Sequence, residues 1–302
     1  MSTKTIVRSY QTRPEWLRER RHGIGASDAA ALYGESPWQS PMSLWAEKRG
    51  LTAPTDEATV PDYIKWGLKL EPLIATAFAE DTGREVIDIP AFTIERDLAH
   101  PELLATLDRR QRTAVGVGIL ELKSTNFFAR KQWNDGVPLY YQIQVQHQLM
   151  VTGEPYASVA VLIAGSEFYW CDIARNDAFI DDLRRRVIEF WGMVIGDIAP
   201  APDASAATKE ALARIFPDVV TPEFVPLATE ALEWDEKRQK GKTMIEAGAK
   251  LVDEAEAHLK LAIGESLGAV LPNQVTYTWK QQTRKPYTVQ GSTFRVLRRK
   301  GE

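Results

Sequence analysis

The sequence contains very little cysteine and histidine. Cys171 is the only cysteine among 302 residues, which excludes a disulfide framework and a four-cysteine zinc or iron–sulfur site. The four histidines lie far apart and show no metal-binding spacing. Any metal should therefore be bound by carboxylates, and a reducing cytoplasm is the expected location.

Long apolar runs and a strong excess of charge are also absent. No stretch approaches the roughly 20 apolar residues that span a bilayer, and no signal-peptide core is present, so we expect neither membrane insertion nor export. The formal net charge of -4 argues against a protein that coats nucleic acid by bulk attraction. It remains compatible with an enzyme that has a local basic channel.

Residues 103–123 contain a compact set of acidic and basic side chains. They form two strand-like runs joined by a polar turn, with Asp108 ending the first run and the triplet Glu121-Leu122-Lys123 ending the second. Because alternate side chains share one face of a strand, Glu121 and Lys123 project together, and a hairpin would bring Asp108 beside them. Two carboxylates can hold a hard cation, and the ammonium can orient a water. A solvated ion pair is the alternative for the triplet alone.

A third carboxylate lies within a predicted helix over residues 61–83. The apolar stripe of this helix includes Ile64, Leu68 and Ile74, and periodicity places Glu71 on the same stripe. A carboxylate that faces a core is costly unless it is paired or holds a metal. Glu71 is thus a candidate site residue, and a hydrogen-bonded glutamate at the edge of the stripe is the alternative.

Two other segments offer polar groups. Ser27 is expected to cap a helix that follows Arg20, and a helix N-terminus beside an arginine can bind an anion. A capped surface helix without a ligand is the alternative. A further helix begins at Pro138, where Gln144 and Gln148 lie one turn apart on the same face.

The last third of the chain has a different pattern. Residues 199–207 have the composition of a linker, and a long helical pattern follows from residue 226. This pattern predicts either a coiled-coil-like helix or a helical hairpin broken near Gly241. From Lys280 onward the chain carries seven Lys or Arg residues and one acid, a tail that suits a nucleic-acid backbone or a solvated terminal strand.

Five short motifs occur in an order that resembles the YqaJ-type viral recombinase nucleases. This family is related to phage lambda exonuclease within the restriction-endonuclease-like PD-(D/E)xK superfamily. The motifs are R-x-x-x-I-G-A-S at residues 20–27, W-G-x-x-x-E at 66–71, A-T-L-D at 105–108, L-E-L-K at 120–123 and Q-V-Q-H-Q-L at 144–149. The resemblance implies an α/β fold with a central mixed sheet flanked by helices. It divides the chain into a nuclease domain over residues 1–198, a linker over 199–225 and a helical extension with a basic tail over 226–302.

The resemblance also implies a metal site. Asp108 and Glu121 would ligate Mg²⁺, for which Mn²⁺ could substitute, and the Leu122 carbonyl would add an oxygen ligand. Glu71 would hold a metal directly or through water. Lys123 would orient the attacking water.

Further residues match positions that contact DNA in this family. Gln144 would help to position the water or the scissile phosphate. The residues that match a pocket for a terminal 5′-phosphate are Arg20, Ser27 and Thr106. Two departures from the family pattern are that Arg109 follows Asp108 where many relatives have glycine, and that the basic residue expected after the triplet appears one position away, as Arg130 or Lys131.

The activity implied by the resemblance is Mg²⁺-dependent hydrolysis of double-stranded DNA from its ends. The preferred hypothesis is a 5′-to-3′ exonuclease of a phage or prophage recombination system, which leaves a 3′ single strand for an annealing protein in the bacterial cytoplasm. A homo-oligomer, in the form of a trimeric ring around DNA, is implied as well. The alternatives are an endonuclease or nickase on the same core, and a non-catalytic protein that binds DNA ends or acts as a scaffold.

Overall fold

A computed structural model describes residues 5–52, 62–286, 288, 291 and 293–300 of the chain. The chain divides into two compact units, Met1–Pro217 and Asp218–Glu302. No helix in the described ranges is long and apolar enough to cross a bilayer.

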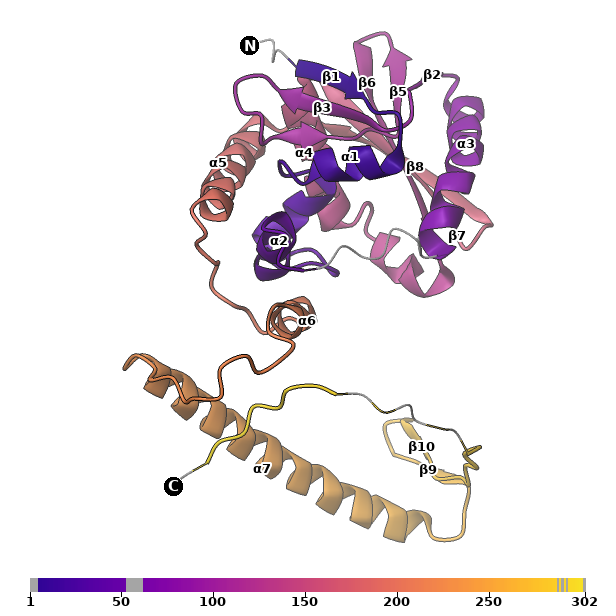
Figure 1. The fold of residues 1–302 in the computed structure, drawn as a ribbon. Helices are drawn as coiled ribbons and strands as arrows, with labels where there is room; N and C mark the ends of the chain where they lie inside the picture. The colour runs from indigo at the N-terminus through magenta and orange to yellow at the C-terminus, as the bar shows by residue number, and fades with distance from the viewer. Residues whose placement is uncertain (1–4, 53–61, 287, 289–290, 292, 301–302) are drawn as a thin grey trace. The chain divides into compact units, whose positions relative to one another are not determined.

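The larger unit is built around a five-stranded sheet (Figure 1). Its strands, in spatial order, are β2 (Glu85–Asp88), β5 (Arg109–Thr113), β6 (Gly116–Thr125), β7 (Tyr156–Ile163) and β8 (Glu167–Ala174). β6 and β7 run parallel, whereas the other neighbouring pairs are antiparallel. The sheet is therefore mixed, which confirms the predicted fold class, and β6 occupies its centre.

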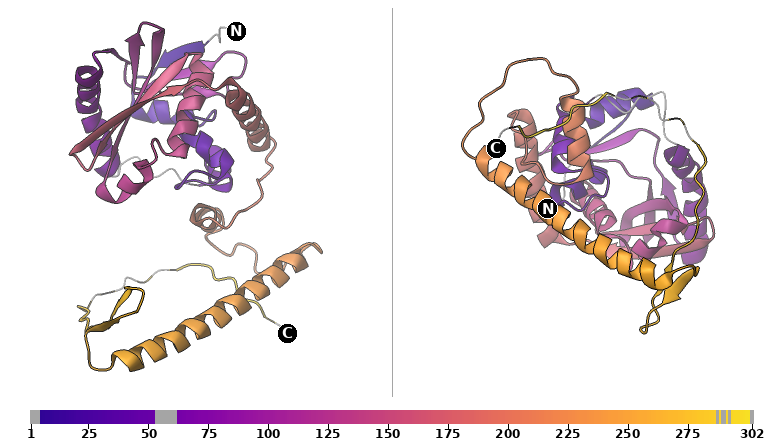
Figure 2. Two further views of the ribbon diagram at one scale, coloured as in Figure 1. Left: turned by 180° about the vertical axis from the view of Figure 1, so that it is seen from behind. Right: turned by 90° about the horizontal axis from the view of Figure 1, so that it is seen from below.

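Helices cover both faces of this sheet. α3 (Asp62–Thr82) lies on one face and α4 (Leu139–Thr152) on the other, and α5 (Asp177–Ile195) packs against α4 (Figures 1 and 2). Buried apolar side chains of α3 pack on Leu120 and Leu122 of β6. The opposite face is closed by a larger apolar cluster that joins α4 and α5 to β6 and β7.

The N-terminal elements add a second layer beside α4. They are β1 (Thr5–Ser9), α1 (Arg13–Arg20), the 3₁₀ helix η1 (Ala26–Tyr33), α2 (Pro41–Lys48), β3 (Thr93–Asp97) and β4 (Leu104–Ala105). Strands β1, β3 and β4 form a separate antiparallel sheet. The chain thus changes sheets between β4 and β5.

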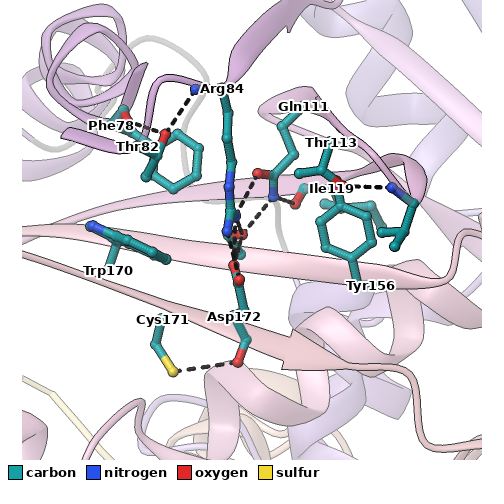
Figure 3. Close-up of polar contacts among 12 residues, drawn as sticks. Phe78, Thr82, Arg84, Gln111, Thr113, Ile119, Tyr156, Trp170, Cys171 and Asp172 are labelled. Carbon is teal, nitrogen blue, oxygen red and sulfur yellow. Dashed lines mark hydrogen bonds and ion pairs between the residues drawn. The ribbon is translucent and has the colours of Figure 1, made fainter. Parts of the chain in front are cut away.

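Arg84 fixes the end of α3 to the central sheet (Figure 3). Its guanidinium donates two hydrogen bonds of 2.7 Å to the carboxylate of Asp172, and it also donates to Gln111 and Ser158 at 3.1 Å. The charged group lies 5.1 Å from the centre of the Trp170 ring. A bidentate pair with these additional partners is a strong interaction, so the position of α3 on the sheet is well defined.

The apolar stripe predicted for α3 is only partly buried. Ile74 and Phe78 are fully covered, but Ile64 and Leu68 are 37% and 57% exposed. The prediction that these two side chains belong to the core is therefore wrong, because periodicity identifies a face of a helix but not how much of that face meets a partner. Pro61, predicted to open the helix, lies outside the described residues.

The range predicted as a linker contains a helix. α6 (Ala206–Ile215) buries Thr208 and Ala211, and the Thr208 hydroxyl donates a 2.8 Å hydrogen bond to Ser40 Oγ. This helix packs on α2. The composition of residues 199–225 predicted a linker and did not reveal that this range contains a packed helix. The boundary between the two compact units follows it, at Pro217 and Asp218.

The described part of the second unit contains one long helix and a small hairpin. α7 (Ala231–Ile263) continues through Gly241, so the hairpin predicted as an alternative at that glycine is wrong. The strands β9 (Gly268–Val270) and β10 (Thr276–Thr278) pair antiparallel after it. A glycine within a helix costs about 1 kcal/mol relative to alanine, which the many other helix formers of α7 offset.

Candidate active site

The hairpin that carries the acidic residues differs from the predicted one. β5 and β6 pair through Arg109 opposite Leu120, and Asp108 immediately precedes β5 instead of ending a strand. β6 continues to Thr125, so the Glu-x-Lys triplet lies inside the strand. The physical reason is that the run before Asp108 pairs with β3 in the other sheet.

Asp108 nevertheless lies beside the triplet. It is one position beyond the Arg109–Leu120 pair, and its Oδ2 accepts a 2.8 Å hydrogen bond from the backbone N–H of Leu122. Glu121 and Lys123 share the face of β6 opposite to Leu122, as the strand period predicts. The two acids and the lysine are thus brought together.

Three side chains hold the carboxylate of Glu121, which is only 2% exposed. Lys123 Nζ donates a short hydrogen bond to Oε1, and Gln144 Nε2 donates to the same oxygen at 2.6 Å. Gln148 Nε2 donates to Oε2 at 2.7 Å. An ionised carboxylate accepts about four hydrogen bonds, so this arrangement leaves acceptor capacity on Glu121.

Lys123 lies between this carboxylate and an aromatic ring. Its ammonium is 4.8 Å from the centre of the Tyr141 ring, which favours a cation. Burial alone would lower the pKa of Lys123, but Glu121 and Asp108 raise it above its ordinary value. Lys123 therefore remains charged at neutral pH and can donate to a water or a phosphate oxygen, but cannot act as a base.

Glu71, on α3, lies near Lys123. Its half-buried side chain, together with Lys123, Leu122 and Ser124, lines a cavity of about 220 Å³. No hydrogen bond or ion pair to the Glu71 side chain occurs within the described part of the chain. Burial raises the pKa of Glu71, Arg109 lowers it, and Glu121 raises it further.

The carboxylates repel one another. Burial and the neighbouring Glu121 raise the pKa of Asp108 well above its ordinary value, and Glu71 adds to this effect. Lys123 and Arg109 do not fully compensate the three acids, since the pKa values of Asp108 and Glu71 remain raised. A hard divalent cation fits this set, because the donors are all oxygens and the negative charge is in excess.

The three acids do not already form a ligand cluster. In the described ranges, no three Asp, Glu, His or Cys side chains are arranged as a metal-binding group. Glu121 makes its hydrogen bonds to Lys123 and the glutamines instead. Cation binding would therefore require these side chains to adjust.

The predicted anion pocket is partly assembled. Arg20 Nη2 donates a 3.1 Å hydrogen bond to Ser27 Oγ. Thr106 reaches the site through its carbonyl oxygen, which accepts a 3.3 Å hydrogen bond from Gln148. The structure thus joins Arg20 to Ser27 and links Thr106 to the group around Glu121.

Ser27 is not the helix cap that the sequence suggested. The cap of η1 is Gly25, whose N–H donates a 3.0 Å hydrogen bond to Asp28 Oδ2. Asp28 also forms a buried ion pair of 2.8 Å with Lys48. Burial alone would raise the pKa of Asp28, but the charges of Lys48 and Arg20 hold this pKa below its ordinary value. The hydroxyl of Ser27 is thereby left to face Arg20.

The two basic residues after the triplet have different surroundings. Both lie in the 3₁₀ helix η2 (Phe127–Trp133). Arg130 donates hydrogen bonds of 2.8 and 3.0 Å to Glu167, whereas Lys131 is exposed and no salt bridge to it occurs among the described residues. Of the two, Lys131 is the cation that remains free to meet a phosphate.

Known proteins resemble this chain in sequence and in fold. Residues 15–155 match the YqaJ-like viral recombinase domain. The chain contains a YqaJ-like viral recombinase domain. Within it lie all the site residues described above, from Arg20 to Gln148. A curated relative, the uncharacterized protein YqaJ of Bacillus subtilis (strain 168), is 39% identical over 213 residues, which cover 69% of this chain and 65% of the relative. The chain thus spans just under two thirds of that relative's length.

Solved structures share the fold of the YqaJ-like domain. The alkaline exonuclease LHK-Exo from Laribacter hongkongensis is 21% identical, with a TM-score of 0.51 over 61% of this chain and 94% of that chain. LHK-Exo in complex with dAMP gives a TM-score of 0.52 at the same identity and coverage. At this identity the likeness concerns the fold.

Gln148 is the site residue that the sequence reasoning did not select. It is fully buried, yet its place one turn after Gln144 was visible in the sequence. The available signal was a pair of glutamines on one face of a helix that follows the Glu-x-Lys strand. The sequence pattern does not show that the Gln148 amide bonds to Glu121, because this contact depends on how α4 packs on β6.

Proposed function

We propose that this protein is a Mg²⁺-dependent deoxyribonuclease that degrades double-stranded DNA from its ends in the 5′-to-3′ direction. The observation that carries the proposal is the meeting of Asp108, Glu121 and Lys123 around the centre of β6. The name of the fold neighbour, an alkaline exonuclease that was also solved with dAMP, supports the same class of reaction. The family description supports a role in phage-type recombination.

In this proposal the chain supplies both the cation site and the orienting groups. Asp108, Glu121 and the Leu122 carbonyl hold Mg²⁺, and Glu71 contributes directly or through water. The bound cation would stabilise the charge that develops on the phosphate and lower the pKa of a water. Lys123, which remains charged, orients the attacking water or donates to a phosphate oxygen. Mn²⁺ has the same preference for oxygen ligands and can substitute.

The other polar residues have positioning roles. Gln144 donates a hydrogen bond to Glu121 from α4, and in this proposal it helps to position the attacking water or the scissile phosphate. In this proposal Arg20 and Ser27, which are hydrogen-bonded to each other, bind the terminal 5′-phosphate together with Thr106, whose carbonyl accepts a hydrogen bond from Gln148. Recognition of a 5′-phosphate would set the direction in which the enzyme degrades DNA, from 5′ to 3′. The 3′ single strand that remains is the substrate of an annealing protein, and a ring-shaped homotrimer would keep the enzyme on DNA.

The test compares three DNA substrates with Mg²⁺ and with EDTA. They are a linear duplex with 5′-phosphates, the same duplex without them, and a closed circle. We expect mononucleotides from the phosphorylated linear duplex in Mg²⁺, slower release from the unphosphorylated duplex, and no products from the circle or in EDTA. Asp108→Ala and Glu121→Ala should abolish product release, because each removes an oxygen ligand.

Each other outcome assigns a different function. Long fragments or cleavage of the circle would show an endonuclease or nickase. Tight binding of DNA ends without hydrolysis in any divalent cation would show a non-catalytic end-binding protein. Wild-type rates in purified Asp108→Ala or Glu121→Ala would refute the site itself.

A further inference from the structure

Aromatic side chains form a continuous cluster that leads away from Lys123. The ammonium of Lys123 lies 4.8 Å from the Tyr141 ring centre, and the Tyr141 ring lies 4.3 Å from that of Tyr140. Trp38 packs edge to face on Tyr140, with ring centres 5.2 Å apart. Trp133 supports Tyr141 from η2 at 5.6 Å. Three consecutive contacts therefore connect the candidate catalytic lysine to Trp38.

Trp38 ends this cluster as an exposed ring on an ordered loop. Its side chain is 67% exposed, although indole is among the largest apolar groups. The loop is held by Ser36 Oγ, which accepts hydrogen bonds from the N–H groups of Trp38 at 3.3 Å and Gln39 at 3.1 Å. Gln39 in turn donates to Glu47 of α2 at 2.9 Å. A large aromatic surface is thus held in place and left open.

The surroundings of this ring suit a polyanion. The Tyr140 hydroxyl donates a 2.8 Å hydrogen bond to Gln132 Oε1, which ties the aromatic cluster to η2, the helix that also carries the exposed Lys131. Burial and Tyr141 raise the pKa of Tyr140 to about 12, so its hydroxyl adds no negative charge at neutral pH. A protein partner would be recognised by an apolar patch, whereas an exposed ring on a cluster that holds the Lys123 ammonium matches a strand of alternating bases and phosphates.

We propose that Trp38 is a stacking platform for an unpaired nucleobase of a DNA strand that passes the site. Stacking uses the π-face that every base has, so the platform accepts any sequence, as a nuclease that degrades whole duplexes requires. Lys131 contacts the backbone phosphate of the same strand. The inference rests on the proposed function only for the identity of the ligand as DNA.

The test measures binding without turnover. The fluorescence anisotropy of a labelled single-stranded oligonucleotide is recorded in EDTA for the wild type, Trp38→Ala and Trp38→Phe. We expect Trp38→Ala to weaken binding by about 5- to 100-fold, the range measured for loss of one stacked base. Trp38→Phe keeps an aromatic face and should retain most of the affinity. Trp234→Ala is the matched control, because its indole on α7 is 65% exposed and should leave the affinity unchanged.

An oligonucleotide series with one abasic position separates stacking from a packing role. The wild type should lose affinity when the abasic position lies at the platform, whereas Trp38→Ala should bind both oligonucleotides equally. Lys131→Ala should instead reduce the dependence of affinity on salt concentration. The proposal would be overturned if the wild type and Trp38→Ala had the same affinity. It would also be overturned if the abasic position reduced the affinity of both proteins equally. These outcomes do not depend on hydrolysis, so failure of the nuclease assay and failure of the platform are distinguishable.

Discussion

Gln148 holds Glu121 from the helix that packs over the sheet. Its Nε2 donates a 2.7 Å hydrogen bond to Glu121 Oε2 and is also within 3.3 Å of the Thr106 carbonyl. The side chain is fully buried, and its Oε1 has no hydrogen-bond partner among the described residues. A buried amide with an unpaired acceptor is costly, and the hydrogen bonds that its Nε2 donates offset part of this cost while they orient Glu121.

Replacement of Gln148 should therefore weaken the proposed cation site. Gln148→Met keeps the length and volume of the side chain but removes its donor. We expect nuclease activity or affinity for Mg²⁺ to fall by about 10- to 100-fold, the usual effect of removing a partner that orients a metal ligand. Initial rates over a Mg²⁺ titration would distinguish a change in half-saturating concentration from a change in maximal rate.

Gln142→Met is the matched control for this variant. Gln142 lies on the exposed side of α4, and its amide bonds to the Val137 carbonyl, not to Glu121. Its Mg²⁺ titration should match the wild type. The orienting role of Gln148 would be excluded if both variants gave the same titration curve.

Removal of the charge of Asp108 should abolish activity but stabilise the fold. Asp108 lies among other acids that repel it, whereas asparagine can still accept the hydrogen bond from the Leu122 N–H. We expect Asp108→Asn to raise the melting temperature in EDTA by about 2–4 °C for each kcal/mol of repulsion relieved. Calorimetry in EDTA and in Mg²⁺ checks this, since Mg²⁺ should stabilise the wild type and not the variant. A lower melting temperature for Asp108→Asn in EDTA would contradict the account.

Arg20 should determine the preference for phosphorylated ends. Its guanidinium faces Ser27 and lies 4.8 Å from the Trp16 ring centre, which restricts its position. We expect Arg20→Ala to reduce the ratio of rates on 5′-phosphorylated and unphosphorylated duplexes by about 10-fold, as the loss of one charge-assisted contact implies. Arg18→Ala, an exposed arginine on the same helix, is the control. An unchanged ratio in Arg20→Ala would place the phosphate elsewhere.

The local part of the site could be predicted from the sequence. Glu121 and Lys123 are two residues apart in a strand, and this period alone directs them to one face. A predicted hairpin placed Asp108 beside them, and the order of motifs placed Glu71 near the same group. The hairpin register was wrong at Asp108 because the residues before it join the sheet of β3, a pairing between distant segments that no local pattern records.

The other incorrect or missing predictions from the sequence also concern contacts between segments that are distant in the chain. Ile64 and Leu68 have the spacing of core residues, yet they are exposed because that part of α3 lies beside a cavity instead of a packed surface. The partner of Gln148 depends on how α4 crosses β6. Spacing determines the face of an element, whereas its neighbours are determined by tertiary packing.

His147 should make the stability of the fold dependent on pH. It is fully buried beside Gln148, its Nε2 lies 3.1 Å from the Leu104 carbonyl oxygen, and burial lowers its pKa to about 4. Among the nearby charges, Asp28 raises this pKa and Arg184 lowers it, and both effects are smaller than that of burial. In the unfolded chain the pKa of histidine is about 6.5.

Between these two pKa values the unfolded chain binds a proton that the folded protein does not. The free energy of unfolding should thus fall as the pH drops from about 6.5 to 4, by on the order of 3 kcal/mol from this residue. At pH 7 the imidazole is neutral in both states, so this loss of stability is absent there. Urea unfolding of the wild type and His147→Gln at pH 7 and pH 5 measures the difference, because glutamine cannot titrate. The exposed His258 provides the control, since His258→Gln should keep the pH dependence of the wild type. Parallel pH profiles for the wild type and His147→Gln would show that the buried imidazole does not titrate between the folded and unfolded states.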